Sequence, residues 1–264
     1  MEAFYIPDPG HPGLYHPTEL TRGPWSPNAQ HGGPPSALLG HAIERCAPRP
    51  GFRVSHVSID VLARVPLEPL LVETDMVKSG HSVELVEGRL IAGGRLVMSA
   101  RAWRYRLADP ELDFPAELLP TGCRPGPDVG SSPAYLGDWP IGYLSAIDYR
   151  FVGGSLSDPG PAVCWIRLKH PVVAGHSPSP LERVLGAADA ASGASGALDM
   201  NRFSFMNTDL VVSLHRQPDD EWIGMDCVTH PQRHGVGVCE AALFDRTGPL
   251  GRSTQTLFIT SRRQ

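Results

Sequence analysis

The sequence predicts an α+β protein made of two similar halves, each with one helix followed by an antiparallel sheet. Three observations predict it. Two amphipathic stretches begin at a proline, each is followed by several β-like segments, and this order recurs in both halves of the 264 residues. With 41% apolar residues, the chain can bury a substantial core without disulfides.

The first helix is expected in the stretch SALLGHAIERCA, which follows Pro34 and Pro35. Its apolar residues recur at the spacing of one helical face: Leu39, Ala42, Ile43 and Cys46. Segments rich in β-branched residues follow and are separated by turn residues. They predict strands over residues 54–65, 70–77, 82–91 and 95–106.

The second helix has a clear start, because Ser179-Pro180-Leu181-Glu182 has the form of a capping box. Ser179 is the expected N-cap, Pro180 the first helical residue, and Glu182 reaches back from the third position. Gly193 is the expected stop. The apolar face contains Leu181, Val184, Leu185 and Ala188, and strands are predicted over residues 208–216, 222–229, 236–244 and 250–260.

The repeat and the positions of proline and glycine predict the domain organisation. Residues 1–106 form an N-terminal unit, residues 107–140 a Pro/Gly-rich linker, and residues 141–264 a C-terminal unit that carries the active site. In both helices small residues such as Gly40 and Gly186 allow close approach to a sheet.

Composition excludes several classes of function. The net charge of −5 gives no broad attraction for nucleic acid, and no apolar run approaches the ~20 residues of a membrane-spanning helix. We therefore expect a cytoplasmic protein without membrane insertion. The cysteines are odd in number and lack zinc-site spacing, which predicts reduced thiols and no structural metal. They are Cys46, Cys123, Cys164, Cys227 and Cys239.

Several segments resemble the type II acyl-CoA thioesterases, a group with two fused hotdog domains. In the first half they are GPW at 23–25, QHGGPPSALL at 30–39 and SGHS at 79–82. In the second half they are SPLERVLGAAD at 179–189, NTDLVVSLHR at 207–216, EW at 221–222 and GPLGRSTQTL at 248–257. The resemblance implies a tandem double hotdog, in which each half is an antiparallel β-sheet wrapped around a central α-helix.

The resemblance also implies a catalytic trio of Asp189, Asn207 and Gln255, which together hold the attacking water. The implied reaction is hydrolysis of a fatty acyl-CoA, or a related pantetheine thioester, to free acid and CoA. Asn207 stands where the best-known members have Thr, although its amide can still hydrogen-bond a water or a carboxylate. If the alignment with the family shifts by one residue, Thr208 takes the place of Asn207 in the trio.

The internal repeat provides a comparison that is independent of any family. When the halves are aligned, Asp189 falls on Ile43, so the fold itself does not require a carboxylate there. Asp189 also lies on the apolar face of its helix, where an unpartnered carboxylate would cost several kcal/mol. It must be hydrogen-bonded, shifted in pKa, or directed at a pocket.

We expect substrate contacts from His31, Gly32, Gly33 and Thr208, with backbone N–H groups near the two glycines as oxyanion donors. Interpretations without a functional role remain open, since a Gly-Gly-Pro-Pro segment before a helix is often only a turn, and most histidines are structural or lie on the surface. CoA is expected only as part of the substrate, with no cofactor, and a homo-oligomer is expected from sheet edges. Candidate contacts for CoA phosphates are Lys78, Arg101, Arg104 and Arg233.

Two other functions remain open. A non-catalytic protein that binds acyl-CoA or acyl lipids would fit the departure at Asn207. A hotdog hydratase ranks last, because such enzymes need a histidine beside the carboxylate and the helix that carries Asp189 has none. The chain has no G-x-S-x-G motif, which argues against a serine hydrolase of the α/β type.

Overall fold

A computed structural model of the protein describes residues 2–122, 124–133, 142–199 and 201–262. Its thirteen strands belong to one sheet. They are β1 (Tyr5–Pro7), β2 (Leu14–Pro17), β3 (Phe52–Val61), β4 (Leu70–Lys78), β5 (Val83–Ala92), β6 (Arg95–Arg106), β7 (Ile147–Gly153), β8 (Ala162–Leu168), β9 (Phe203–Asn207), β10 (Asp209–Leu214), β11 (Ile223–Pro231), β12 (Val236–Asp245) and β13 (Gly248–Ser261). The α-helices are α1 (Gly33–Arg45), α2 (Pro180–Ala188) and α3 (Ala191–Ala194).

The order of strands shows the repeat directly. The sheet runs β1-β2-β4-β5-β6-β3 and continues as β10-β13-β12-β11-β8-β7, so it has the same connectivity when read from either end. All these neighbours are antiparallel, and β9 adds to the end of β13. The halves join where β3 pairs with β10, with Ile59 opposite Leu210. Each helix therefore occupies the same place in its own half.

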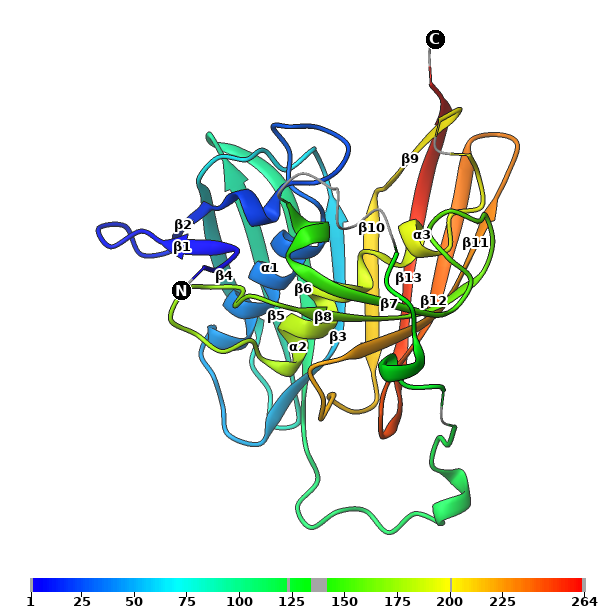
Figure 1. Ribbon diagram of the computed structural model, residues 1–264. Coiled ribbons are helices and arrows are strands. Elements are labelled where there is room, and N and C mark those ends of the chain that lie inside the picture. Colours follow the sequence, from blue (N-terminus) through cyan, green and yellow to red (C-terminus); the bar gives the residue numbers. More distant parts are fainter. Residues whose placement is uncertain (1, 123, 134–141, 200, 263–264) are drawn as a thin grey trace.

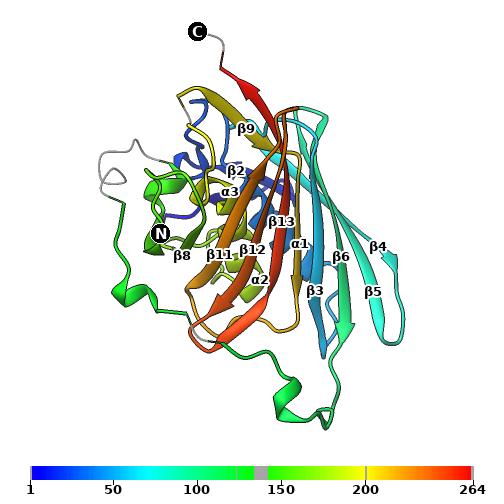
Figure 2. The ribbon, with the colours of Figure 1, turned by 90° about the vertical axis from the view of Figure 1, so that its right-hand side faces the viewer.

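The helices lie together on one side of the sheet (Figure 2). α1 and α2 run antiparallel, because the start of α1 meets the end of α2 and Glu44 near the end of α1 accepts a hydrogen bond from Ser179 at the start of α2. Gly40 makes this close packing possible, since a Cβ there would lie 2.7 Å from the Leu185 side chain. A larger residue would push the two helices apart.

The predicted start of the second helix is confirmed, whereas α1 begins at Gly33, three residues before the predicted stretch. Two details of the second helix are wrong. Ser179 accepts a hydrogen bond from the Glu182 N–H, as a cap should. The Glu182 carboxylate does not reach back and instead contacts His41 of α1 at 2.9 Å. α2 ends at Ala188 rather than at Gly193, and Asp189 is its C-cap. A short second helix, α3, then follows.

The segments predicted as strands are confirmed with small shifts at their ends. β3 differs most from its predicted bounds. It ends at Val61, whereas the prediction extended it to Val65, the residue before Pro66. Five strands went unpredicted, namely β1, β2, β7, β8 and β9. β1, β2 and β9 are short and β8 is a run without alternation, so their patterns are weak. β7 alternates cleanly from Ile147 to Phe151 and was overlooked. The described part of the predicted linker, 107–122 and 124–133, contains only two 3₁₀ turns, Ala116–Leu118 and Pro127–Val129, and an isolated bridge at Ser131.

The four described cysteines, at 46, 164, 227 and 239, carry free thiols, and Cys123 lies outside the described residues. No helix in the described ranges combines the length and the apolar character needed to cross a bilayer.

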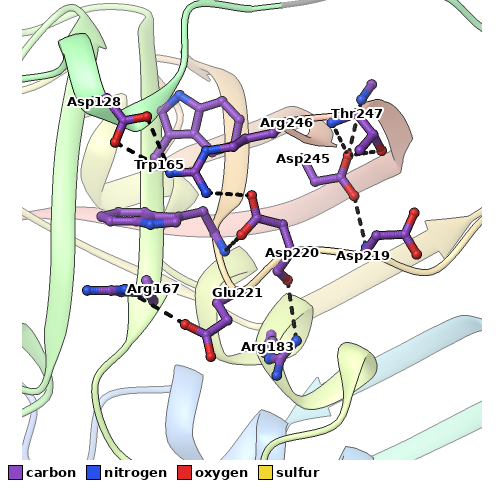
Figure 3. Close-up of polar contacts among 12 residues, drawn as sticks. Asp128, Trp165, Arg167, Arg183, Asp219, Asp220, Glu221, Asp245, Arg246 and Thr247 are labelled. Carbon is purple, nitrogen blue, oxygen red and sulfur yellow. Dashed lines mark hydrogen bonds and ion pairs between the residues drawn. The ribbon is translucent and has the colours of Figure 1, made fainter.

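The β12–β13 turn depends on the buried carboxylate of Asp245 (Figure 3). Both of its oxygens accept from Arg216, at 2.5 and 2.8 Å, and it also accepts from Thr247 and from the Asp219 and Gly248 N–H groups. Burial acts to raise the pKa of Asp245, but these hydrogen bonds outweigh it and hold the pKa well below its usual range.

Asp245→Asn should therefore lower the free energy of unfolding by about 3 kcal/mol, because it removes the charge of a buried carboxylate and leaves Arg216 with only its longer contact to the exposed Asp219, at 3.5 Å. Because the folded pKa is lowered, the stabilisation is complete above about pH 4 and is lost only as the pH falls through the folded value. Urea unfolding at neutral pH measures the loss. The control is Asp226→Asn, whose exposed pair with Arg124 contributes under about 1 kcal/mol; equal losses for the two variants would contradict the prediction.

Candidate active site

The carboxylate of Asp189 lies at the end of α2 with its side chain only 5% exposed. Its Oδ1 accepts a hydrogen bond from Asn207 Nδ2 at 2.9 Å and a weaker one from Gln255 Nε2 at 3.4 Å. Three residues predicted to act together, and separated by up to 66 positions, are thus in contact. Both amides donate to the carboxylate itself, so they orient Asp189 directly.

Two strands bring the amides to this point. Asn207 is the last residue of β9 and pairs with Leu257 of β13, two residues beyond Gln255. Gln255 is fully buried and held at both ends, because its Oε1 accepts from the Ser192 N–H and its Nε2 donates to the Asp189 carbonyl. The break between α2 and α3 exposes these backbone groups, which a continuous helix would have used internally.

His31 completes the site from the other half of the chain. Its Nδ1 lies 3.1 Å from Asp189 Oδ2 and 3.1 Å from the Gly33 nitrogen. Its ring stacks on Tyr143, with the centroids 4.0 Å apart. Because Nδ1 holds at most one hydrogen, it either donates to Asp189 or accepts from Gly33. Sequence reasoning considered His31 as a substrate contact but did not place it against the carboxylate.

Burial lowers the pKa of His31, while the neighbouring charge of Asp189 acts to raise it. The balance favours a neutral imidazole at neutral pH. A neutral ring can hold the carboxylate through one N–H without adding a second full charge to the site.

Gly32 and Gly33 allow α1 to approach Asp189 closely. A Cβ on Gly32 would lie 2.6 Å from Asp189 Oδ1, and one on Gly33 would lie 2.6 Å from the Gly186 carbonyl oxygen. The next two residues are prolines without N–H groups, so Gly33 supplies the single N–H of the first three helical positions. The positive end of the α1 dipole therefore lies beside the carboxylate.

Thr208 does not belong to this cluster. Its side chain is exposed, and its hydroxyl reaches only the Thr256 carbonyl, at 3.5 Å. Thr208 is the bend residue between β9 and β10, and its exposed side chain does not share the partly buried position of Asn207 beside Asp189. Asn207, and not Thr208, therefore contacts Asp189, whereas Thr208 as a substrate contact stays a prediction.

Tyr143 and Ser192 are parts of the site that sequence reasoning missed. Tyr143 is fully buried, stacks on His31 and donates from its hydroxyl to the Gly186 carbonyl at 2.7 Å. Ser192 contributes only its backbone N–H. Neither lies in a recognisable motif, because their roles come from loop geometry that no local pattern encodes.

A shallow apolar pocket adjoins the site. Ser192, which binds Gln255, is at one edge, and the pocket continues along β9 and β13. The remaining lining is Gly196, Ala197, Leu198, Phe205, Thr229, Pro231, Leu257 and Ile259. The pocket is small, with room for about one water molecule.

The contact with Asp189 can be tested through the titration of His31. Asp189→Asn should lower the pKa of His31 further below its ordinary value of about 6.5, because the variant removes the charge that stabilises the imidazolium. An NMR pH titration of the histidine ring carbons measures this, with Asp60→Asn on the exposed face of β3 as the control. A higher or unchanged His31 pKa in Asp189→Asn would contradict the geometry.

Known families match both halves of the chain. Residues 21–105 match the acyl-CoA thioesterase N-terminal domain, and residues 120–259 match the acyl-CoA thioesterase C-terminal domain. No curated protein sequence matches the chain significantly.

Solved structures share the fold at low sequence identity. A candidate thioesterase II from Thermobifida fusca has a TM-score of 0.75 at 18% identity, covering 97% of this chain and 95% of that one. A hot dog fold protein of unknown function from Alicyclobacillus acidocaldarius has a TM-score of 0.71 at 14% identity, with 96% and 95% covered.

The acyl-CoA thioesterase II TesB2 from Mycobacterium marinum has a TM-score of 0.63 at 14% identity, with 96% and 93% covered. The two family matches together span most of the sequence, from residue 21 to residue 259. The chain therefore belongs to the acyl-CoA thioesterase family and is a thioester hydrolase.

Proposed function

We propose that the protein hydrolyses a fatty acyl-CoA to the free acid and CoA, with Asp189, Asn207 and Gln255 as its catalytic residues. The observation that carries the proposal is the buried Asp189 carboxylate, which three side chains from other elements hold at the start of α1. A fold has no need of a charge at this place, because the corresponding residue of the first half, Ile43, is fully buried in the apolar core.

Asp189 acts as the general base. It takes a proton from a water molecule, whose oxygen then forms a bond to the thioester carbonyl carbon. Asn207 and Gln255 fix the orientation of the carboxylate, so that its lone pairs are aimed before the substrate arrives. The carbon–sulfur bond then breaks, and the proton held by Asp189 goes to the departing CoA thiolate.

The Gly33 N–H is the proposed donor to the oxyanion. It lies at the positive end of α1, where developing negative charge is favoured. In the tautomer in which His31 donates from Nδ1 to Asp189, the imidazole no longer accepts from Gly33. That tautomer leaves the Gly33 N–H available to the substrate.

A hydratase is the second candidate, and one observation favours it. The sequence argument against it was that no histidine accompanies Asp189, yet His31 Nδ1 lies 3.1 Å from the carboxylate. The two reactions are separated by supplying an enoyl-CoA and following both products. Loss of the conjugated double bond without release of thiol would identify a hydratase, whereas thiol release identifies the thioesterase.

The proposal includes the tandem hotdog architecture, in which the sheet of each half wraps around its own helix. Its support is the close approach of α1 to β5, where a Cβ on Gly88 would lie 3.1 Å from Leu39. The division into 1–106, 107–140 and 141–264, the homo-oligomer and the cytoplasmic location stay predictions.

Asp189→Asn should lower kcat by about 10² or more, the scale expected for loss of a general base, and should leave the fold intact. The assay is release of CoA thiol over a panel of acyl chain lengths, with far-UV circular dichroism as the check on folding. Asp60→Asn, on the exposed face of β3, is the matched control and should keep the wild-type rate. Wild-type turnover by Asp189→Asn would refute the assignment.

Asn207→Ala and Thr208→Ala form a second matched pair. Asn207→Ala should lower kcat by about tenfold or more, because the carboxylate loses its shortest hydrogen bond. Thr208→Ala should leave kcat unchanged, since that side chain is exposed and its hydroxyl reaches only the Thr256 carbonyl. The same thiol assay measures both, and a larger loss in Thr208→Ala would overturn the roles given to these neighbours.

A further inference from the structure

Tyr143 contacts both elements that bring His31 and Asp189 together. It begins a 3₁₀ turn, Tyr143–Ser145, which lies just before β7 and against the first residue of α1 (Figure 1). Its side chain is fully buried, and its ring lies over the His31 imidazole with the centroids 4.0 Å and the planes 15° apart. Its hydroxyl donates to the Gly186 carbonyl of α2 at 2.7 Å. A single side chain therefore joins His31 to the helix that ends at Asp189.

The backbone sets the position of Tyr143 beside His31. The Thr21 carbonyl accepts from the His31 N–H at 2.8 Å. The carbonyl of the next residue, Arg22, accepts from the Tyr143 N–H at 2.9 Å. Gly142 permits this second contact, because a Cβ there would lie 2.7 Å from the Arg22 carbonyl oxygen. Consecutive residues of one segment thus hold the two stacked rings side by side.

The Tyr143 hydroxyl also completes the end of α2. In a continuous helix the Gly186 carbonyl would accept from the N–H of Ala190, but that N–H donates to Ala187 at 3.0 Å. The hydroxyl takes its place at a carbonyl that the helix end would otherwise leave unpaired, three residues before Asp189. Burial raises the pKa of Tyr143, and the charge of Asp189 raises it further, so the hydroxyl stays protonated and keeps donating.

The ring of Tyr143 favours the neutral form of His31. Burial lowers the pKa of His31, and the Tyr143 ring covers one face of the imidazole, from which it excludes water. Among the described residues, the titratable groups that face the imidazole are Asp189 at the end of α2 and Tyr143 itself. The guanidinium of Arg22, in the segment that binds both backbones, pairs with Glu19. The charge of Asp189 is therefore what opposes the effect of burial on His31.

The protonation state of His31 matters for hydrolysis, because Asp189 must accept a proton from water in the proposed mechanism. A neutral imidazole gives the carboxylate one N–H and adds no net charge. An imidazolium would form an ion pair with the carboxylate, stabilise its ionised form and oppose the proton transfer. Holding His31 neutral and in place therefore favours the general base.

We propose that Tyr143 is a positioning residue of this site, which keeps the neutral His31 ring against Asp189 and fixes the end of α2 from which the carboxylate projects. The inference rests on the proposed function and adds a residue to it. Because its hydroxyl is engaged at Gly186, Tyr143 acts through His31 and α2, and not on the thioester itself.

Two substitutions separate the two contacts of Tyr143. Tyr143→Leu removes the ring, so water should reach the imidazole and the lowered pKa of His31 should rise to about 6.5, its ordinary value. Activity should then be lost at a higher pH as the pH falls, with kcat about fourfold further below wild type at about pH 6 than at about pH 8. Tyr143→Phe keeps the ring, so the pKa of His31 should stay at its wild-type value. Its kcat should fall by about threefold or more at every pH, because the end of α2 loses a hydrogen bond.

An NMR titration of the histidine ring carbons measures the pKa of His31, and release of CoA thiol over the same pH range measures kcat. Tyr149→Phe is the matched control. Tyr149 is another buried tyrosine of the second half, and its hydroxyl has no hydrogen-bond partner among the described residues. This control should keep both the wild-type kcat and the wild-type pKa of His31.

A His31 pKa that stays at the wild-type value in Tyr143→Leu would overturn the proposal, as would a loss of kcat by the same factor at every pH, which a merely structural role predicts. If Tyr143→Leu does not fold, Tyr143→Phe decides, and wild-type kcat in that variant overturns the proposal. The His31 titration needs no turnover, so it stays informative even when the wild type hydrolyses no thioester, the result that refutes the proposed function alone.

Discussion

The site depends on one packing constraint, the antiparallel contact between α1 and α2. Gly32, Gly33 and Gly40 contribute no side chains of their own to this contact, so the start of α1 comes directly against Asp189 and the Gly186 carbonyl. This contact joins a helix dipole, a carboxylate and an imidazole that come from both halves of the chain. Wider helix spacing would break all three interactions together.

The two ends of the helix pair differ in the partners of their carboxylates. At the other end the corresponding polar groups neutralise one another: Glu182 is fully buried against His41 and Arg45, and Glu44 accepts from Ser179. The two ends of the same architecture therefore differ in what their charges contact. At one end they are enclosed in a structural network, and at the other they adjoin an apolar pocket.

Particular residues show how far sequence reasoning reached. Helix starts were predictable because Pro34 and the Ser179 cap act locally, and β6 was predicted with its bounds because its pattern alternates strongly. The end of α2 was not predictable. Small residues continue past Ala188, and the backbone groups at the break are paired with Gln255, which lies 66 residues further along the chain than Asp189. β9 also escaped prediction, although it carries Asn207.

The sequence by itself determined the repeat, the helix starts and the unusual carboxylate on an apolar helical face, because each is a matter of local pattern and spacing. Only the tertiary structure decided that His31 and Tyr143 join the site and that Asn207, and not Thr208, contacts Asp189. The physical reason is that strand register and helix contact set distances between residues far apart in the chain, and no local preference encodes them.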